Sequence, residues 1–388
     1  MKTLVIDIHS LNRFQITRQD TPFFYKLIKK YGLGKVRPCF AYDIQTCFWT
    51  GTYPEKNNHF AKYEYHKKYD RFRFIDLFPN KLRNISYNLW KYLKGDDFFT
   101  NLCSNKYTHH FKIARKFHFF HKKVFKVPTT FDILRKNNKT FLYYQWPTIA
   151  TNNGWKLRIF PRLDDVMISK KFIKLAEKNN NLDFYFMQLR DLDILAHKYG
   201  PYSEQVKKKL RIIDQLLEDI LNNFSLKEDN ILIFSYFGMV PVIGKVNLKK
   251  LLPQFGNGYY YFLDSTEARF WFFNSKIKKQ VINILKKIKQ GHLLTKKEKI
   301  DYHVNFKDNR HFEELFLLNP GYIISPDFFQ KIPIKGAHSY GLKCDEEKGI
   351  FLTNRKSRKE AELVDMMPTL LDFYSIKSKS DGSSILLI

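Results

Sequence analysis

The residues of this sequence best suited to chemistry are carboxylates and imidazoles that follow short apolar runs. Asp193 and His197 stand four residues apart after such a run, and Gly200 and Pro201 follow them. Carboxylate oxygen and imidazole nitrogen are ligands that suit zinc. An isolated pair of this kind is usually a solvated surface pair, but a position just beyond a strand favours a ligand role. The segment therefore predicts a metal-binding hairpin with Asp193 and His197 as ligands.

The elements that must position these residues alternate between strands and long helices. Three short apolar runs predict buried strands: Thr3–Ile8, Phe184–Leu189 and Ile231–Ser235. Three segments have helical patterns or boundary signals: Pro22–Tyr31, Asp164–Lys178 and Glu204–Asn223. The alternation predicts a parallel α/β sheet, whose ligand sites lie beyond the carboxyl ends of the strands. Asp7, Asp193 and Ser235–Phe237 all fall at such ends.

The composition indicates a folded, strongly basic protein. The chain has 388 residues, of which 44% are hydrophobic and 17% aromatic, and disordered chains have far fewer of both. The net charge of +29 attracts polyanions such as nucleic acid, phospholipid headgroups or phosphorylated substrates. The frequent Lys, Asn, Phe, Tyr and Ile are also typical of an AT-rich coding sequence, so part of the charge needs no partner.

The cysteines and the apolar runs bear on the cellular compartment. The cysteines, at positions 39, 47, 103 and 344, have neither metal-ligand nor disulfide-framework spacing, so a reducing compartment is expected. The apolar run at the N-terminus is too short for a signal peptide, and no run is long enough for a transmembrane helix. We expect a cytoplasmic protein, either soluble or attached peripherally to a membrane.

A basic, aromatic-rich segment, residues 56–150, interrupts the alternation of strands and helices and is densest over 111–125. Basic residues among aromatic ones suit nucleic acid or an anionic membrane interface. The alternative is a helix that buries its aromatic side and solvates its lysines. The segment has no zinc-finger, Walker or RNA-binding motif. We predict a single domain over residues 1–388, with 56–150 as an insertion or cap.

Six landmarks along the chain together resemble the alkaline phosphatase superfamily, and within it the type I phosphodiesterase/nucleotide pyrophosphatase branch. Asp7 closes the first strand, and five motifs follow in the family's order: Thr50-Gly51-Thr52-Tyr53-Pro54, Asp193 and His197 with Gly200-Pro201, Ser235 with Gly238-Met239, Gly336-Ala337-His338-Ser339-Tyr340, and Asp365 to Leu371. Six landmarks in order are far more specific than one. The resemblance implies a three-layer α/β/α core with a mainly parallel central sheet.

The resemblance also implies a metal-dependent site. The family uses two divalent metals, usually zinc, for phosphoryl transfer. One of them would be held by Asp193, His197 and His338. The second would need Asp7, an Asp-His pair and the nucleophile, and His9 could reach the same cavity as Asp7. We therefore expect one divalent metal, zinc, with the second site in doubt.

The remaining positions of the second metal site depart from the family pattern. Tyr236 and Phe237 stand where the Asp-His pair is expected, and a phenol is a poor zinc ligand while a phenyl ring is none. The nucleophile position is Ala41, which cannot attack a phosphate. Asp43 offers a carboxylate and Thr46 a hydroxyl nearby, but neither has the family's spacing. The losses thus cluster at one metal, which is the pattern expected when a single function is dropped.

These departures leave two main interpretations. The first is a metal-dependent phosphodiesterase or phosphohydrolase acting on a phosphate-containing substrate, with one metal site preserved and the nucleophile and second metal site lost. The second is a catalytically inactive family member that binds anionic ligands or a partner protein. Nucleic-acid or membrane binding through the basic segment is a third possibility. Arg269 is a candidate contact for a substrate phosphate, with structural pairing as the alternative.

Overall fold

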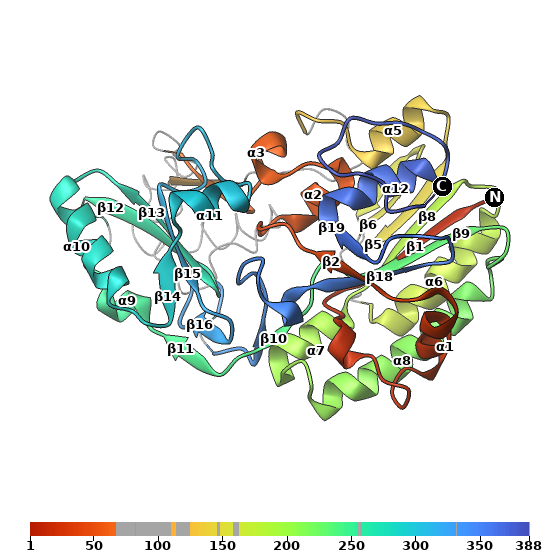
Figure 1. Ribbon diagram of the computed structural model, residues 1–388, viewed down its shortest axis with the longest axis horizontal. Helices are drawn as coiled ribbons and strands as arrows, with labels where there is room; N and C mark the ends of the chain where they lie inside the picture. Colours follow the sequence, from red (N-terminus) through yellow and green to blue (C-terminus); the bar gives the residue numbers. More distant parts are fainter. Residues whose placement is uncertain are drawn as a thin grey trace. The chain divides into compact units, whose positions relative to one another are not determined.

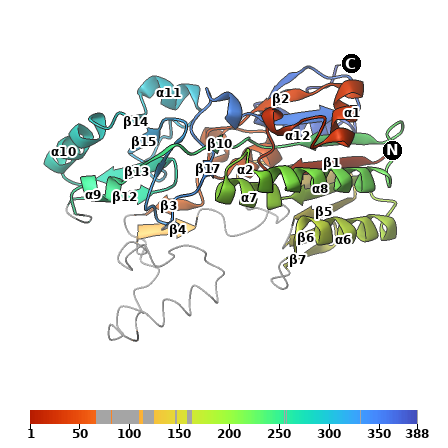
Figure 2. The same cartoon turned by 90° about the horizontal axis from the view of Figure 1, so that it is seen from below.

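Figures 1 and 2 show the computed structural model of the chain. The structure describes residues 1–66, 82, 110–113, 125–145, 148–157, 163–254, 256, 258–330 and 332–387. Residue contacts divide the chain into two compact units, each built from segments that are distant in the sequence. The first unit comprises Met1–His59, Phe117–Pro241 and Ile334–Ile388, and the second comprises Phe60–Lys116 and Val242–Pro333.

The first unit contains a nine-stranded sheet with the order β19-β2-β18-β9-β1-β8-β5-β6-β7. Its strands are β1 (Thr3–Ile8), β2 (Gly34–Arg37), β5 (Phe141–Gln145), β6 (Thr148–Thr151), β7 (Gly154–Leu157), β8 (Phe184–Leu189), β9 (Asn230–Phe234), β18 (Gly349–Thr353) and β19 (Glu360–Glu362). Only β6 and β18 run opposite to the other strands of this sheet. The prediction of an α/β fold with a mainly parallel sheet is confirmed.

Helices cover both faces of this sheet, as Figure 1 shows with layers below and above the strands. One apolar cluster joins the sheet to α1 (Pro22–Tyr31), α6 (Asp165–Lys178), α7 (Asp191–Tyr199) and α8 (Glu204–Leu221). The other joins it to α2 (Ile44–Thr50), α5 (Thr130–Lys136) and α12 (Met366–Asp372). Residues of β1 alternate between the clusters, because successive side chains of a strand point to opposite faces. The predicted three-layer α/β/α arrangement follows.

Local signals explain where the long helices begin and end. α1 starts at Pro22 and ends at Gly32, which has a φ of 82°. The Asp164 side chain caps α6 by accepting from the Met167 N–H at 2.8 Å. The Ser203 side chain caps α8 in the same way. The three helices predicted from the sequence are confirmed, with boundaries that differ by at most two residues.

The strands bring their carboxyl ends to one edge of the sheet. In the parallel ladders, Asp7 of β1 is in register with Gln188 of β8 and with Phe234 of β9. Two short strands, β10 (Val240–Pro241) and β17 (Gly336–Ala337), form an antiparallel pair in the same unit. The helix α3 (Pro54–Asn57) and the 3₁₀ turns η1 (Arg13–Gln15), η4 (Asp345–Glu347) and η5 (Leu363–Asp365) complete its described elements.

The second unit is built on a four-stranded antiparallel sheet of order β12-β13-β15-β14. Its strands are β12 (Tyr259–Leu263), β13 (Glu267–Phe272), β14 (Gly291–Leu293) and β15 (Glu314–Leu318). Other strands form two pairs: β3 (Tyr63–Tyr65) with β4 (Phe111–Ile113), and β11 (Gly244–Val246) with β16 (Tyr322–Ile324). The helices are α9 (Leu248–Leu251), α10 (Ser275–Lys286) and α11 (Lys296–Asp301), and Figure 2 shows α10 and the strands of this sheet from a second side.

The predicted insertion, residues 56–150, lies mostly outside the described residues, including most of its basic stretch 111–125. Its described part includes β5 and the start of β6, which belong to the nine-stranded sheet. The division into a single domain with a basic insertion stays a prediction. Within the described part of the chain, no helix has the length and apolar character needed to cross a membrane.

Candidate metal centre

Helix α7 carries Asp193 and His197 side by side, because residues four apart lie on the same face of a helix. The His197 Nε2 atom is 3.6 Å from the Asp193 Oδ1 atom. Leu192 and Ala196, also four apart, are buried and anchor the opposite part of the helix in the core. The prediction of a hairpin for this segment was therefore wrong. The segment is a helix that ends at Gly200.

His338 reaches the same place from a distant part of the sequence. It follows β17, and the His197 Nδ1 atom lies 2.8 Å from the carbonyl oxygen of Gly336 in that strand. The ring centroids of His197 and His338 are 5.2 Å apart. Ligand atoms of Asp193, His197 and His338 all lie within 4.8 Å of one another, the one such group of three or more among the described residues.

The protonation and orientation of these side chains fit a divalent metal. His197 donates its Nδ1–H to Gly336, which leaves its Nε2 lone pair on the side of Asp193. Burial and the neighbouring His197 lower the pKa of His338 to about 3, so its imidazole is neutral. Burial alone would raise the pKa of Asp193, but His197, His9 and His338 hold it below its usual value. Neutral imidazole and ionised carboxylate are the forms that bind metals, and zinc suits this donor set.

Asp7 lies at the end of β1 and is fully buried. Its Oδ2 atom accepts a hydrogen bond from Gln188 Nε2 at 2.6 Å and lies 3.1 Å from His9 Nδ1. Burial raises the pKa of Asp7, while His9 and Gln188 oppose that shift. Burial alone would lower the pKa of His9, but the adjacent Asp7 carboxylate outweighs it and raises the pKa. The chain itself therefore supplies the partners of the Asp7 Oδ2 atom, while the buried Oδ1 atom has no hydrogen-bond partner among the described residues.

Gln188 was missed by the sequence analysis, and the reason is structural. Its one signal in the sequence is a polar side chain within the apolar run of β8. The parallel register that sets it beside Asp7 appears only when β1 and β8 are paired. The His9 ring lies beside Asp7, with its Nδ1 atom 3.1 Å from the Asp7 Oδ2 atom.

Tyr236 and Phe237 come after β9 and Ser235, and both are buried. Their rings meet the His9 ring edge-on, with centroids 5.7 Å and 4.9 Å away. Phe237 also stacks on His338, with centroids 4.1 Å apart. Burial and the nearby Asp7 raise the pKa of the Tyr236 phenol well above its ordinary value, so the phenol keeps its proton. Two aromatic rings thus pack against His9, whose Nδ1 atom lies beside Asp7.

Ala41, at the expected nucleophile position, and the two candidates near it, Asp43 and Thr46, lie in or before α2. Ala41 is buried and lines a cavity of about 10 Å³ together with Phe237 and Ser339. That volume holds about one water molecule. Thr46 is fully buried within α2, and its role stays a prediction. Asp43 is the N-cap residue of α2 and is partly exposed, and its role stays a prediction.

Glu347 is a further buried carboxyl group that the sequence analysis missed. Its two oxygens accept from the Tyr340 N–H at 2.8 Å and 2.9 Å, and burial raises its pKa to about 8. It therefore holds the turn that follows His338, in which Ser339 has a φ of 73°. An acidic residue in a charged loop gives no sequence signal for such a role.

Arg269 belongs to the second unit and is 1% exposed. Its Nε atom is 3.1 Å from a Glu267 oxygen, and its Nη1 atom donates to the Tyr63 carbonyl oxygen at 2.9 Å. These partners engage the guanidinium inside the unit, so the geometry favours structural pairing over contact with a substrate phosphate. Glu267 and Arg269 lie on the same face of β13, because side chains two apart in a strand do so.

Comparisons with known proteins agree with this fold. A model of the type I phosphodiesterase/nucleotide pyrophosphatase family matches residues 3–319. Human ectonucleotide pyrophosphatase/phosphodiesterase 5 is 17% identical, with a TM-score of 0.68 and coverage of 99% of this chain and 97% of that chain. The murine protein is 16% identical, with a TM-score of 0.70 and coverage of 99% of this chain and 98% of that chain. An inactive threonine-to-alanine variant of the murine protein, in complex with AMP, is 17% identical. Its TM-score is 0.69, with coverage of 99% of this chain and 97% of that chain. No curated protein matches the chain.

Proposed function

Because this chain belongs to the type I phosphodiesterase/nucleotide pyrophosphatase family, we propose that it holds one divalent metal and binds a phosphate-containing ligand there, without the family's nucleophile-dependent phosphoryl transfer. One observation carries the proposal. The ligand atoms of Asp193, His197 and His338 converge within 4.8 Å, whereas the Asp7 carboxylate already has the His9 ring as its partner.

Zinc is the metal that the chain's donor set favours. Three protein ligands with one open position are typical of sites where zinc meets a ligand or substrate. When bound, the ion supplies positive charge and Lewis acidity toward phosphate oxygens. The buried Asp193 Oδ1 atom has no hydrogen-bond partner among the described residues, as suits an atom that faces a cation. The Gly336 carbonyl fixes the orientation of His197 from behind.

The surroundings of Asp7 support the loss of the second metal. Its Oδ2 atom is already engaged by Gln188 and by His9. The neighbouring Tyr236 and Phe237 offer a protonated phenol and no ligand atom, respectively. A cation bound at Oδ2 would have to displace these contacts, whereas the buried Oδ1 atom has no hydrogen-bond partner among the described residues. We infer that His9 and Gln188 stabilise Asp7 in the role that a second metal fills in the family.

The proposed ligand is a nucleotide or a similar phosphate ester. The inactive murine relative was solved in complex with AMP, so that protein binds a nucleotide although it is inactive. In this chain Ala41 stands at the expected nucleophile position and lines only a small cavity. Binding of a phosphate group therefore does not depend on a nucleophilic side chain at this position.

Residual hydrolysis is the second candidate function. It is favoured by the completeness of the Asp193, His197 and His338 set, since a single zinc site with an open position can support hydrolysis in other enzymes. Such a reaction would proceed without a covalent intermediate on the protein. The two candidates share the metal site and differ in turnover.

The experiment that tests the proposal is a calorimetric titration of AMP into the zinc-loaded protein. We expect AMP binding that requires zinc and that weakens by at least about tenfold in His338→Ala. The matched control is His292→Ala, which removes a histidine that is 44% exposed at its side chain and paired with Glu298. AMP binding that is equal with and without zinc would refute the proposal. Turnover of bis(nitrophenyl) phosphate that is lost in His338→Ala would establish the second candidate instead.

Three further expectations extend this proposal. We propose that the basic segment 56–150 contributes attraction toward anionic ligands, and that an anionic membrane surface or nucleic acid is a further partner of that segment. The net charge of +29 supports such attraction in general, because it raises the local concentration of anions. A cytoplasmic location also stays a prediction.

A further inference from the structure

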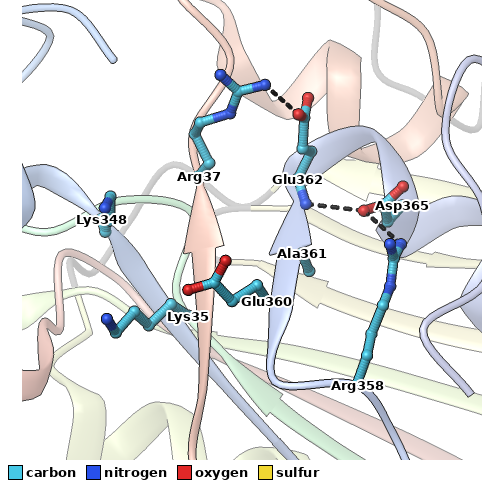
Figure 3. Close-up of a pocket in the computed structure, with 8 residues that line it drawn as sticks. All are labelled: Lys35, Arg37, Lys348, Arg358, Glu360, Ala361, Glu362 and Asp365. Carbon is cyan, nitrogen blue, oxygen red and sulfur yellow. Dashed lines mark hydrogen bonds and ion pairs between the residues drawn. The ribbon is translucent and has the colours of Figure 1, made fainter. Parts of the chain in front are cut away.

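A cavity of about 370 Å³ opens at the edge of the nine-stranded sheet, over β2 and β19 (Figure 3). Cavities of this size hold small molecules. Its lining is dominated by charge, with four basic and three acidic side chains around Ala361: Lys35, Arg37, Lys348, Arg358, Glu360, Glu362 and Asp365. None of these residues belongs to the candidate metal centre.

The register of the two edge strands arranges these charges in order. In the parallel ladder Lys35 is opposite Glu360, and Arg37 is opposite Glu362. Side chains alternate along a strand, so these four lie on one face while Val36 and Ala361 between them point to the other. Val36 and Ala361 are buried in the apolar cluster on that side. The charged face is therefore fixed by the core beneath it.

The third basic residue, Lys348, directly precedes β18, the strand that pairs with β2 on the side away from β19. The antiparallel ladder sets Gly349 of β18 opposite Val36, so the preceding residue, Lys348, comes to lie beside Arg37. Figure 3 shows Lys348, Arg37 and Glu362 across the three segments in this order. Like charges on neighbouring strands repel each other. Among the described residues, Lys348 has one acidic partner, Asp345, at 2.7 Å.

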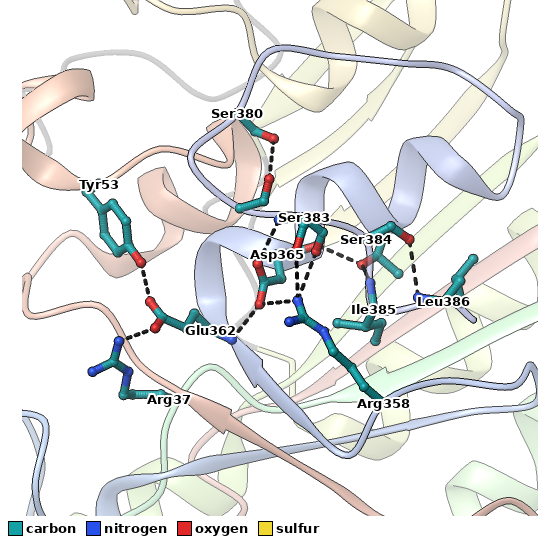
Figure 4. Close-up of polar contacts among 12 residues, drawn as sticks. Arg37, Tyr53, Arg358, Glu362, Asp365, Ser380, Ser383, Ser384, Ile385 and Leu386 are labelled. Carbon is teal, nitrogen blue, oxygen red and sulfur yellow. Dashed lines mark hydrogen bonds and ion pairs between the residues drawn. The ribbon is translucent and has the colours of Figure 1, made fainter. Parts of the chain in front are cut away.

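Two arginines of the cavity are held in place by acidic groups. Arg37 binds one oxygen of Glu362, and the Tyr53 hydroxyl donates to the other oxygen (Figure 4). Arg358 binds Asp365 at 2.7 Å and the Ser383 carbonyl oxygen at 3.1 Å. A guanidinium has five N–H donors, and each arginine directs only one nitrogen, Nη2, into these contacts. These contacts thus fix the orientation of both guanidinium groups at the lining of the cavity.

Lys35 completes the basic side of the cavity. Among the described residues, no hydrogen bond or ion pair of its ammonium group is seen, and its cross-strand neighbour Glu360 is exposed. Lys35 and Arg37 stand two residues apart on the same face of β2, with Lys348 next to them. Lys35, Arg37 and Lys348 therefore line the part of the cavity formed by β2 and the residue before β18, and Figure 3 shows the Glu360 carboxylate reaching over β2 toward Lys35.

We propose that this cavity is an anion site that takes the phosphate group of a small phosphorylated ligand between Lys35, Arg37 and Lys348. A phosphate monoester carries close to two negative charges and three strong acceptor oxygens, so it can meet three donors at once. A carboxylate offers two oxygens and one charge, and two of the three carboxylates already in the lining hold arginines. The inference does not rest on the proposed function, because no residue of the metal site takes part.

The test is a titration of inorganic phosphate into the full chain carrying Asp193→Asn, kept free of zinc and at low salt, so that phosphate cannot be held at the metal site. We expect one saturable binding event that weakens by at least about tenfold in Lys35→Met and again in Lys348→Met. Lys35→Arg keeps the charge and retains binding. Lys26→Met, which removes an exposed lysine of α1, is the control and leaves binding unchanged.

Two results would overturn the site. One is the absence of saturable phosphate binding at concentrations up to about 10 mM in the Asp193→Asn background. The other is binding that Lys35→Met and Lys26→Met weaken equally, since that result reports only the general positive charge of the chain. Thermal unfolding of each variant shows whether it is folded. If AMP fails to bind at the metal site, the phosphate titration and the comparison of Lys35→Met with Lys26→Met still test this cavity.

Discussion

The ring of Phe237 stacks on the ring of His338, with centroids 4.1 Å apart and an angle of 28° between the planes. Phe237 follows β9 and His338 follows β17, so the stack joins segments that are far apart in the sequence. On another side Phe237 meets the His9 ring edge-on at 4.9 Å. The phenyl ring of Phe237 thus packs directly against His338, a candidate metal ligand.

Replacement of Phe237 is expected to weaken both the fold and the metal site. Phe237→Ala should lower the free energy of unfolding by about 3 kcal/mol, because a buried ring is lost. Zinc affinity should fall by about tenfold, since His338 loses the ring that orients it. Denaturant unfolding and a competition titration with a zinc chelator measure the two effects. Phe273→Ala, at a ring that is 48% exposed, is the control. Unchanged zinc affinity would show that the stack does not position His338.

The turn after His338 gives a prediction about backbone strain. Ser339 has a φ of 73°, a conformation that costs a non-glycine residue about 1 kcal/mol or more. Ser339→Gly and Ser339→Ala both remove the hydroxyl group that lies 3.0 Å from His338 Nδ1. We expect the glycine variant to be more stable than the alanine variant by about 1 kcal/mol in thermal or denaturant unfolding. Equal stability of the two variants would contradict the assigned strain.

Much of the fold was predictable because its signals are local. The apolar runs of β1, β8 and β9 are buried on both faces and bounded by polar residues, which marks strands of a covered parallel sheet. Pro22 and Gly32 mark the ends of α1. The segment containing Asp193 was predicted as a hairpin, since a motif specifies ligands but not the local backbone. The signal for a helix in the sequence was the four-residue spacing of Leu192 and Ala196, two apolar residues that are buried in the structure.

The candidate site was predictable only in part, because half of it depends on pairing between distant segments. The motifs indicated Asp193, His197 and His338, and the structure brings them together. Gln188 reaches Asp7 through the register of two strands, which no single segment of sequence encodes. Glu347 accepts a hydrogen bond from the Tyr340 N–H in the turn after His338, because the loop between them folds back. Partners of this kind become visible only in three dimensions.

A third prediction concerns the second metal position. Tyr236→Asp with Phe237→His restores the residue types that the family pattern expects, yet His9 still engages Asp7. We expect this double variant to hold one zinc and the triple variant with His9→Ala to hold two, because Asp7 is then freed for a metal. Elemental analysis of the folded variants measures the ratio. A second zinc in the double variant would show that His9 does not block the site.

The second unit provides a prediction about pH. Asp327 is 5% exposed, and burial together with the nearby Asp264 raises its pKa from 3.8 to about 7. At a pH between these two pKa values, the Asp327 carboxyl group keeps its proton in the folded state but has lost it in the unfolded state. The free energy of unfolding therefore falls as the pH rises toward 7. The full effect is up to about 4 kcal/mol. Asp327→Asn should flatten this part of the profile in denaturant unfolding, and exposed Asp301→Asn should not. An unchanged slope in Asp327→Asn would assign the pH dependence to other groups.

The central claim is a single metal held by Asp193, His197 and His338. The most direct measurement is the zinc content of the purified chain after loading with zinc and removal of the excess, compared with the His338→Ala variant. We expect one zinc per chain in the natural sequence and a loss of most of it in His338→Ala, because two ligands hold zinc poorly. Two zinc ions per chain, or none, would contradict it.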